Sequence, residues 1–144
     1  MNISFNNISL ELIKEKMITN ILNNSSIIDG FLVDHILKSQ HYQIKFNNTN
    51  IGYFSIHKNN LLTQFYVEPA YSYISQEIFN KIKKIEKVQF AFVPTSDELF
   101  LSHSLDNFER IEKQAYFFIY LSKNKINIAD HFQCKVASIS KYNF

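Results

Sequence analysis

The sequence predicts a single-domain α/β protein with an α+β mixed sheet, in the element order β-α-α-β-β-β-α-β-α-β. Residues 61–67 alternate like a β-strand, and after Pro69 the apolar residues Ile78 and Ile82 recur at helical spacing. Residues 88–93 are nearly all apolar, which is typical of a short strand buried on both faces of a sheet. A strand, a helix and a second strand in this order predict two neighbouring parallel strands.

The composition is that of an ordinary globular chain. Its 144 residues suffice for one domain with a core, and a net charge of +2 is too small to indicate nucleic acid or a membrane as partner. A single cysteine excludes an internal disulfide framework and a Cys-x-x-Cys metal site, so no metal is expected. Neither a signal peptide nor an apolar run of ~20 residues is present, which predicts a cytoplasmic protein.

A short strand and two helices are expected in the first part of the chain. Residues 2–7 favour the strand, and residues 9–22 favour a helix with Ser9 as its N-cap. Residues 29–38 form the second predicted helix. Its core-facing residues are expected to be Phe31, Leu32, His35 and Ile36, with His35 interpreted as a core or boundary histidine.

A three-stranded meander is predicted next. Its strands are residues 41–46, 51–57 and 61–67, joined by the Asn-rich connections 47–50 and 58–60. Asparagine tolerates the positive φ that tight turns require, so these connections favour antiparallel hairpins.

Two further helices follow the meander. The first is predicted over residues 73–85, and the second over residues 98–105. Thr95 and Glu98 have the spacing of a capping box, with Thr95 as the N-cap, and Asn107 is expected to end the helix in a left-handed conformation.

The last part of the chain divides at residue 121. Residues 110–121 predict one long aromatic strand that completes the domain, so residues 1–121 are expected to form it. Residues 122–144 are interpreted as a linker and a C-terminal helical tail, or as the start of a second domain.

Element order and lengths over residues 9–121 resemble the GNAT N-acetyltransferase fold. In that family the fourth strand ends in Val-x-Pro, as Val67-Glu68-Pro69 does here, and the following Gly-rich turn and helix hold the pyrophosphate of acetyl-CoA. The resemblance implies acetyl transfer from acetyl-CoA to an amine of a small molecule or peptide. Where the family has Asn and then Tyr seven residues later, this chain has Ser96 and His103.

The pyrophosphate turn departs from the family pattern Gln/Arg-x-x-Gly-x-Gly/Ala. Ala70 replaces the first residue, while Tyr73 and Ser75 replace the two small residues, and the chain's two glycines lie elsewhere. A tyrosine at the position of closest approach is expected to fill the space of a phosphate. The turn is therefore interpreted as degenerate, with weak or absent binding of acetyl-CoA.

The resemblance also implies candidate site residues. Glu68, or alternatively a backbone carbonyl acting through a water, is the candidate base, and His103 is the candidate acid. The candidate cofactor-binding residues are Tyr66 and Val67, through their backbone, together with Ser72, Tyr73 and Ser75.

Three functions remain open. The chain is an acetyltransferase with a diverged phosphate turn, or the N-terminal half of a two-domain acetyltransferase. Alternatively it is a non-catalytic GNAT-like module for dimerisation or small-ligand binding, with a second GNAT domain or a homodimer as partner. The third function is sensing, with an aromatic pocket around Tyr66, Tyr71, Tyr73 and Phe118 and no relation to acyl transfer.

Overall fold

The computed structural model describes residues 2–24, 28–85 and 88–114, and the residues up to Lys113 belong to one compact unit. The α+β mixed sheet predicted from the sequence is confirmed. The elements are β1 (Ile3–Ile8), η1 (Leu10–Leu12), α1 (Lys14–Asn23), α2 (Gly30–Leu37), β2 (Gln40–Phe46), β3 (Thr49–His57), β4 (Leu61–Val67), η2 (Pro69–Ile74), α3 (Ser75–Lys83), β5 (Phe90–Ala91) and α4 (Glu98–Leu105), where η denotes a 3-10 helix.

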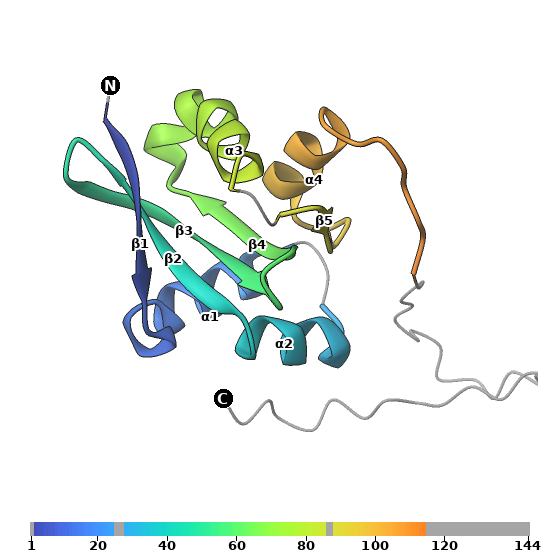
Figure 1. Cartoon of the computed structure of the whole chain (residues 1–144). Helices are drawn as coiled ribbons and strands as arrows, with labels where there is room; N and C mark the ends of the chain where they lie inside the picture. Colours follow the sequence, from blue (N-terminus) through green and yellow to red (C-terminus); the bar gives the residue numbers. More distant parts are fainter. Residues whose placement is uncertain (1, 25–27, 86–87, 115–144) are drawn as a thin grey trace, which may run out of the picture. The chain divides into compact units, whose positions relative to one another are not determined.

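The five described strands form one sheet in the order β1-β2-β3-β4-β5 (Figure 1). The first four strands pair antiparallel, and β5 pairs parallel to β4, as predicted. The hairpin turns contain Asn47, Asn48, Lys58 and Asn59, all with positive φ. Asparagine thus supplies three of the four left-handed positions, which confirms the reason given for these turns.

Helices cover both faces of the sheet (Figure 1). Helices α1 and α2 lie on one face, and α3 and α4 on the other. Successive strand residues point to opposite faces, so Tyr53 packs with α1 and α2 while Phe54 packs with α3 and α4. The same alternation in β4 directs Phe65 and Tyr66 to opposite faces. Within the described residues, no helix is long and apolar enough to cross a membrane.

Two predicted helix starts were wrong. The first long helix begins at Lys14 after the 3-10 turn η1, and Ser9 makes no side-chain capping bond. Helix α3 begins at Ser75 rather than at residue 73, because the preceding residues form the 3-10 helix η2 with Pro69 in its first turn. Proline fixes φ for a helical turn, and here the turn is the tighter i→i+3 form.

The second helix agrees better with the prediction. Asp29 caps α2 by accepting the N–H of Leu32. Phe31 was wrongly assigned to the core, since its side chain is 56% exposed. His35 lies at the boundary, half-buried, and its Nδ1 donates to the Phe31 carbonyl.

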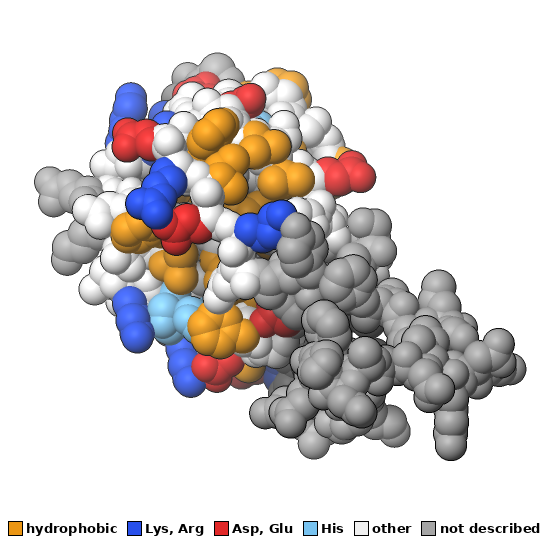
Figure 2. Space-filling model, turned by 90° about the vertical axis from the view of Figure 1, so that its right-hand side faces the viewer, with side chains coloured by type: hydrophobic (Ala, Val, Ile, Leu, Met, Phe, Trp, Pro, Cys, Tyr) orange, Lys and Arg blue, Asp and Glu red, His pale blue; other side chains and the backbone are white. Residues whose placement is uncertain are grey.

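The strand predicted over residues 88–93 is much shorter and less buried than expected. Only Phe90–Ala91 form β5, and Phe90 is 60% exposed. Figure 2 shows hydrophobic side chains on the surface at the side of the molecule where β5 and α4 lie in Figure 1. The nearly all-apolar sequence of residues 88–93 predicted a strand buried on both faces of the sheet. In the structure β5 pairs with β4 at only two positions, Leu61 and Leu62.

The end of α4 also differs from the prediction. Asn107 does not have positive φ; its side-chain amide donates to the His103 carbonyl and its oxygen accepts from Lys83. The side chain therefore satisfies a helix carbonyl without a left-handed cap. Residues 110–114 form no strand, and the remainder of the predicted strand and the tail lie outside the described residues.

The N-cap of α4 was wrongly assigned to Thr95. Asp97 precedes the helix, and its side chain accepts the Phe100 N–H at 3.1 Å. We expect Asp97→Ala to lower the free energy of unfolding by about 1 kcal/mol, because a helix amide loses its acceptor. Thr95→Ala should change it by less than about 0.5 kcal/mol. Urea unfolding of both variants checks this, and equal losses would contradict the assignment of Asp97.

Candidate functional site

Strands β4 and β5 separate soon after they pair. Their last described link is the Phe92 N–H donating to the Leu62 carbonyl at 2.8 Å. Beyond Leu62, no described strand occupies the outer edge of β4, although β3 pairs with its inner edge as far as Val67. Peptide groups at this outer edge are therefore free of strand partners among the described residues, and a ligand can use them.

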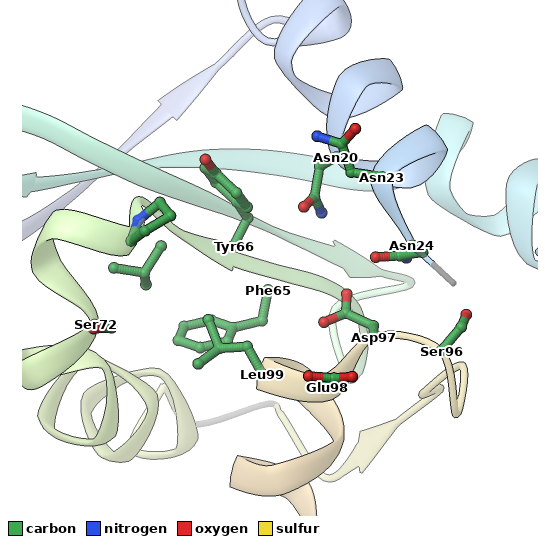
Figure 3. Close-up of a pocket in the computed structure, with 12 residues that line it drawn as sticks. Asn20, Asn23, Asn24, Phe65, Tyr66, Ser72, Ser96, Asp97, Glu98 and Leu99 are labelled. Carbon is green, nitrogen blue, oxygen red and sulfur yellow. The ribbon is translucent and has the colours of Figure 1, made fainter. Parts of the chain in front are cut away.

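A cavity of about 420 Å³ lies beside this open edge (Figure 3). This volume falls within the range of small-molecule sites. The end of α1, the second half of β4, η2 and the start of α4 form its walls. The lining residues are Asn20, Asn23, Asn24, Phe65, Tyr66, Val67, Pro69, Ser72, Ser96, Asp97, Glu98 and Leu99.

Asparagine amides line one side of the cavity, and the charged residues of the lining are carboxylates. Figure 3 shows Asn20 and Asn24 at the end of α1 opposite Asp97 at the start of α4, with their polar groups directed toward the space between the helices. The lining contains the carboxylates Asp97 and Glu98 and no Lys, Arg or His. Burial raises the pKa of Asp97, and the Phe100 N–H opposes this shift. The described residues contain no group of three metal-ligating side chains.

Three of the predicted cofactor-binding residues line the cavity and two do not. Tyr66, Val67 and Ser72 belong to its wall. Tyr73 is 71% exposed, and Ser75 is buried with its hydroxyl donating to the Ser72 carbonyl at 2.6 Å. The structure therefore brings the β4 residues and Ser72 together and leaves Tyr73 and Ser75 outside the cavity.

In the turn after β4, backbone N–H groups donate to carbonyls of the same turn. The Tyr71 N–H donates to the Glu68 carbonyl at 2.8 Å, and the Ser75 N–H donates to the Ser72 carbonyl. In a 3-10 helix each N–H pairs with a carbonyl three residues back. The amides that a glycine-rich turn directs toward a phosphate are thus bonded within η2.

The predicted base, Glu68, is half-buried and forms an ion pair with Lys16 of α1. The Lys16 ammonium also lies 5.6 Å from the ring centre of Tyr66, which stacks on Tyr53. Glu68 does not line the cavity, although its neighbours Val67 and Pro69 do.

The predicted acid, His103, is buried between α4 and α3. Its Nδ1 lies 2.7 Å from Gln76 Oε1, and its Nε2 lies 2.8 Å from Ser75 Oγ. The Ser75 hydroxyl in turn donates to the Ser72 carbonyl, so the ring belongs to a short hydrogen-bonded chain between α4 and η2. Burial lowers the pKa of His103. This histidine links two helices and is neither on the surface nor at the cavity.

His103 should make stability depend on pH. Its pKa is lowered in the folded state by burial, so the unfolded chain binds more protons near the usual value of about 6.5. Stability should therefore be full above that value and fall as the pH decreases below it. Unfolding by urea at several pH values should show a smaller loss in His103→Gln. His41 and His57, whose pKa values are also lowered, remain in both proteins; identical pH profiles would contradict the role of His103.

Several lining residues were not identified from the sequence. Asn20, Asn23 and Asn24 are not among the predicted site residues, although their close spacing places three amides at the C-terminal end of α1. Asp97 was overlooked because the capping box pointed to Thr95. Asp97 directly precedes Glu98, the first residue of α4, and this position in the sequence could have identified it both as the N-cap and as a residue at the start of the helix.

Comparison with known families decides the assignment of the fold. Residues 9–121 match the family model described as an acetyltransferase (GNAT) domain. The chain belongs to the GNAT acetyltransferase family. No curated protein sequence matches it. The match covers β4, η2, α3, β5 and α4, so the open edge of β4 and the cavity lie within the GNAT domain.

Solved structures of GNAT proteins share the fold. An acetyltransferase from the GNAT family of Colwellia psychrerythraea is 23% identical with a TM-score of 0.67, over 72% of this chain and 41% of that chain. The ribosomal-protein-alanine N-acetyltransferase of Brucella melitensis biovar Abortus 2308 is 11% identical with a TM-score of 0.56, over 83% and 99%. A possible acetyltransferase from Clostridium difficile 630 is 14% identical with a TM-score of 0.50, over 83% and 99%. The chain thus spans less than half of the Colwellia protein.

Proposed function

We propose that the open edge of β4 and the adjoining cavity form the acyl-thioester cleft of an N-acetyltransferase domain. The observation that carries the proposal is the separation of β4 and β5 beyond Leu62. The Tyr66 carbonyl faces β3, so by strand alternation the backbone groups of Val67 face the open edge. An extended amide-containing chain, such as the arm of acetyl-CoA, can bond to them as an added strand does. The cavity next to this edge then holds the acetyl group and the acceptor amine.

The reaction needs few protein groups. An ammonium acceptor first loses a proton, and its nitrogen lone pair attacks the thioester carbonyl. The new C–N bond forms, the C–S bond breaks, and the nitrogen loses its second proton while the leaving thiolate takes one. The products are the acetylated amine, the free thiol and one proton released to solvent.

The bonding of η2 supports weak binding at the phosphate end of acetyl-CoA. Amides of Tyr71 and Ser75 are bonded within the turn, and the turn carries no Lys, Arg or Gln. The carboxylates at the cavity add repulsion to a polyphosphate. In this proposal the β4 edge contributes most of the affinity and the turn contributes little.

The proton-transfer roles of Glu68 and His103 stay predictions. Glu68 must leave Lys16 to reach the cavity, and His103 has both ring nitrogens engaged behind Ser75. If they act as base and acid, Glu68→Gln and His103→Gln lower kcat at least about tenfold with KM unchanged. The cytoplasmic location expected from the sequence also stays a prediction.

A second candidate function is the cofactor-free half of a larger acetyltransferase. It is favoured by the bonded turn and by the length of the Colwellia protein, of which this chain covers 41%. In that case a second domain would perform the transfer, and the β4 edge of this domain would bind no thioester.

NMR titration of the ¹⁵N-labelled chain with acetyl-CoA distinguishes these functions. We expect shifts at the Tyr66 and Val67 amides and at the start of α4. Ser96→Phe should weaken binding by filling the cavity mouth, whereas Ser102→Phe, on an exposed part of α4 outside the cavity, should not. Absence of shifts along β4 at acetyl-CoA concentrations about tenfold above a millimolar Kd would overturn the proposed function.

A further inference from the structure

We propose that α2 is released from the sheet at mildly acidic pH, because His35 of α2 and His57 at the end of β3 face each other across this interface and both gain charge there. Helix α2 packs on β3 and β4, beside the hairpin that joins these strands (Figure 1). The inference concerns the end of β4 that lies away from the cavity, and it does not depend on the thioester cleft.

The two imidazole rings are in contact. Their centroids lie 4.6 Å apart, with an angle of 52° between the ring planes. The His57 side chain is only 7% exposed and His35 is half-buried, so the pair has limited access to water. Nδ1 of His35 donates to the Phe31 carbonyl, so this ring takes up a proton at Nε2. Two charged imidazoles at such a distance repel each other, and the repulsion is stronger where water does not screen it.

The other charged groups at this interface are mainly positive. Lys38 after α2 and Lys58 after β3 are the lysines that bear on His57. The carboxylate of α2 that bears on both histidines, Asp34, is paired with Lys38 at 2.7 Å, which holds the pKa of Asp34 below its usual value. Asp34 is therefore already charged before the histidines gain protons. Acid then places four cations, two lysines and two histidines, against one carboxylate.

Polar groups also form part of the contact between α2 and the sheet. Ser39, just after α2, donates to the His35 carbonyl at 2.7 Å, and its hydroxyl lies 3.0 Å from Thr63 Oγ1. On the same sheet, Nδ1 of His41 lies 2.8 Å from Ser55 Oγ, while its buried Nε2 has no hydrogen-bond partner among the described residues. Burial lowers the pKa of His41. Water can replace these bonds when the helix separates, so such an interface opens more readily than an apolar one.

Release of α2 reaches the point where β4 and β5 separate. The ring of Phe92 lies 6.0 Å from that of Phe31 and 6.3 Å from that of His35. The Phe92 N–H also donates to the Leu62 carbonyl, in the last described link between the two strands. Loss of α2 removes these ring contacts, and we expect the link to Leu62 to open with the helix.

The direction of the pH effect follows from the protons bound in the packed and released states. Burial and then the neighbouring His35 ring lower the pKa of His57 while α2 is packed, and the His35 backbone opposes this shift. After release the pKa returns toward its usual value of about 6.5. The released state then binds more protons, so α2 is held fully above that value and progressively less as the pH falls below it.

Hydrogen exchange followed by NMR on the ¹⁵N-labelled chain tests the proposal without any ligand. We expect the protection factors of residues 33–37 in α2 and of Phe92 to fall at least about tenfold between about pH 7 and about pH 5. At the lower pH the α2 amides should also be at least about tenfold less protected than those of residues 79–83 in α3, because the release is local.

Two histidine variants make the test specific. His57→Gln keeps a polar side chain and removes the group that gains charge, so the fall in α2 protection should shrink to less than about threefold. His103→Gln removes a buried histidine on the other face of the sheet, between α3 and α4, and should leave the tenfold fall at α2 unchanged.

His35→Gln gives the same test on a half-buried residue, should His57→Gln fail to fold. Removing either ring ends the repulsion within the pair, so this variant should also reduce the fall. The proposal is wrong if α2 and α3 are equally protected at about pH 5, which would indicate a single global opening. It is also wrong if the pH dependence at α2 is the same in the parent and in whichever of the two variants folds.

Discussion

Gly52→Ala is expected to lower the free energy of unfolding by about 3 kcal/mol or more, because overpacking against backbone cannot be relieved by a side-chain rotation. A Cβ on Gly52 would lie 2.1 Å from the carbonyl oxygen of Tyr66 and 3.1 Å from the Val67 Cα. Strand β3 must then move away from β4 at the residues that line the cavity. The structural role of this glycine is close approach, since its φ is not positive.

Gly30→Ala is the matched control for this variant. An added Cβ at Gly30, the first residue of α2, meets nothing within 4 Å. Alanine favours helix over glycine, so we expect this variant to be stabilised by about 0.5–1 kcal/mol. Urea unfolding measures both changes. A Gly52→Ala protein as stable as the parent would show that β3 and β4 are not held together as described.

The second large effect concerns affinity for acetyl-CoA, which we expect to be millimolar or weaker. The turn lacks the two or three charge-assisted hydrogen bonds that a glycine-rich turn gives a pyrophosphate. Each is worth roughly 1.5–3 kcal/mol, so the loss is about 3–9 kcal/mol, and every 1.4 kcal/mol is tenfold in affinity. A micromolar site thereby becomes a millimolar one or worse.

Tyr73→Gly isolates the contribution of the tyrosine ring. The sequence predicts that this ring fills the phosphate space; in the structure its side chain is 71% exposed and does not line the cavity. We therefore expect the variant to bind acetyl-CoA less than about tenfold tighter than the parent, because the turn amides stay bonded to carbonyls. Low-micromolar binding by the unmodified chain, measured by calorimetry, would refute the account of the turn.

The sequence predicted the central strands and turns well where side-chain alternation and turn preference determine the local structure. Residues 61–67 alternate, lie just before Glu68-Pro69 and form β4 with the predicted bounds. Of the five asparagines in the two predicted connections, Asn47, Asn48 and Asn59 adopt the left-handed conformation. In these segments turn preference and side-chain alternation favour the same structure, so the sequence is sufficient.

Tertiary context decided the elements that were predicted wrongly. The apolar run at residues 88–93 indicated a doubly buried strand, yet pairing with β4 stops after Leu62 and β5 stays short. Thr95 and Asp97 are both good N-caps, and only the path of the chain into α4 selects Asp97. Such choices depend on neighbouring strands and helices that a local pattern does not contain.

The candidate site was predicted in part for the same reason. Tyr66, Val67 and Ser72 follow from the position of β4, which the sequence defined. His103 was placed by spacing alone, and spacing gives no information about burial beneath Ser75. The polar wall from α1 was missed because its contact with the start of α4 joins segments more than 70 residues apart.

We propose that this GNAT domain binds a thioester along β4 and does not hold the pyrophosphate. The most direct measurement compares the Kd of acetyl-CoA with that of S-acetylpantetheine, which lacks the pyrophosphate and nucleotide, using the amide signals of Tyr66 and Val67. We expect both ligands to bind, with Kd values within about threefold of each other, because the turn contributes little. Acetyl-CoA binding about a hundredfold tighter than the fragment, or failure of both to shift these amides, would contradict the claim.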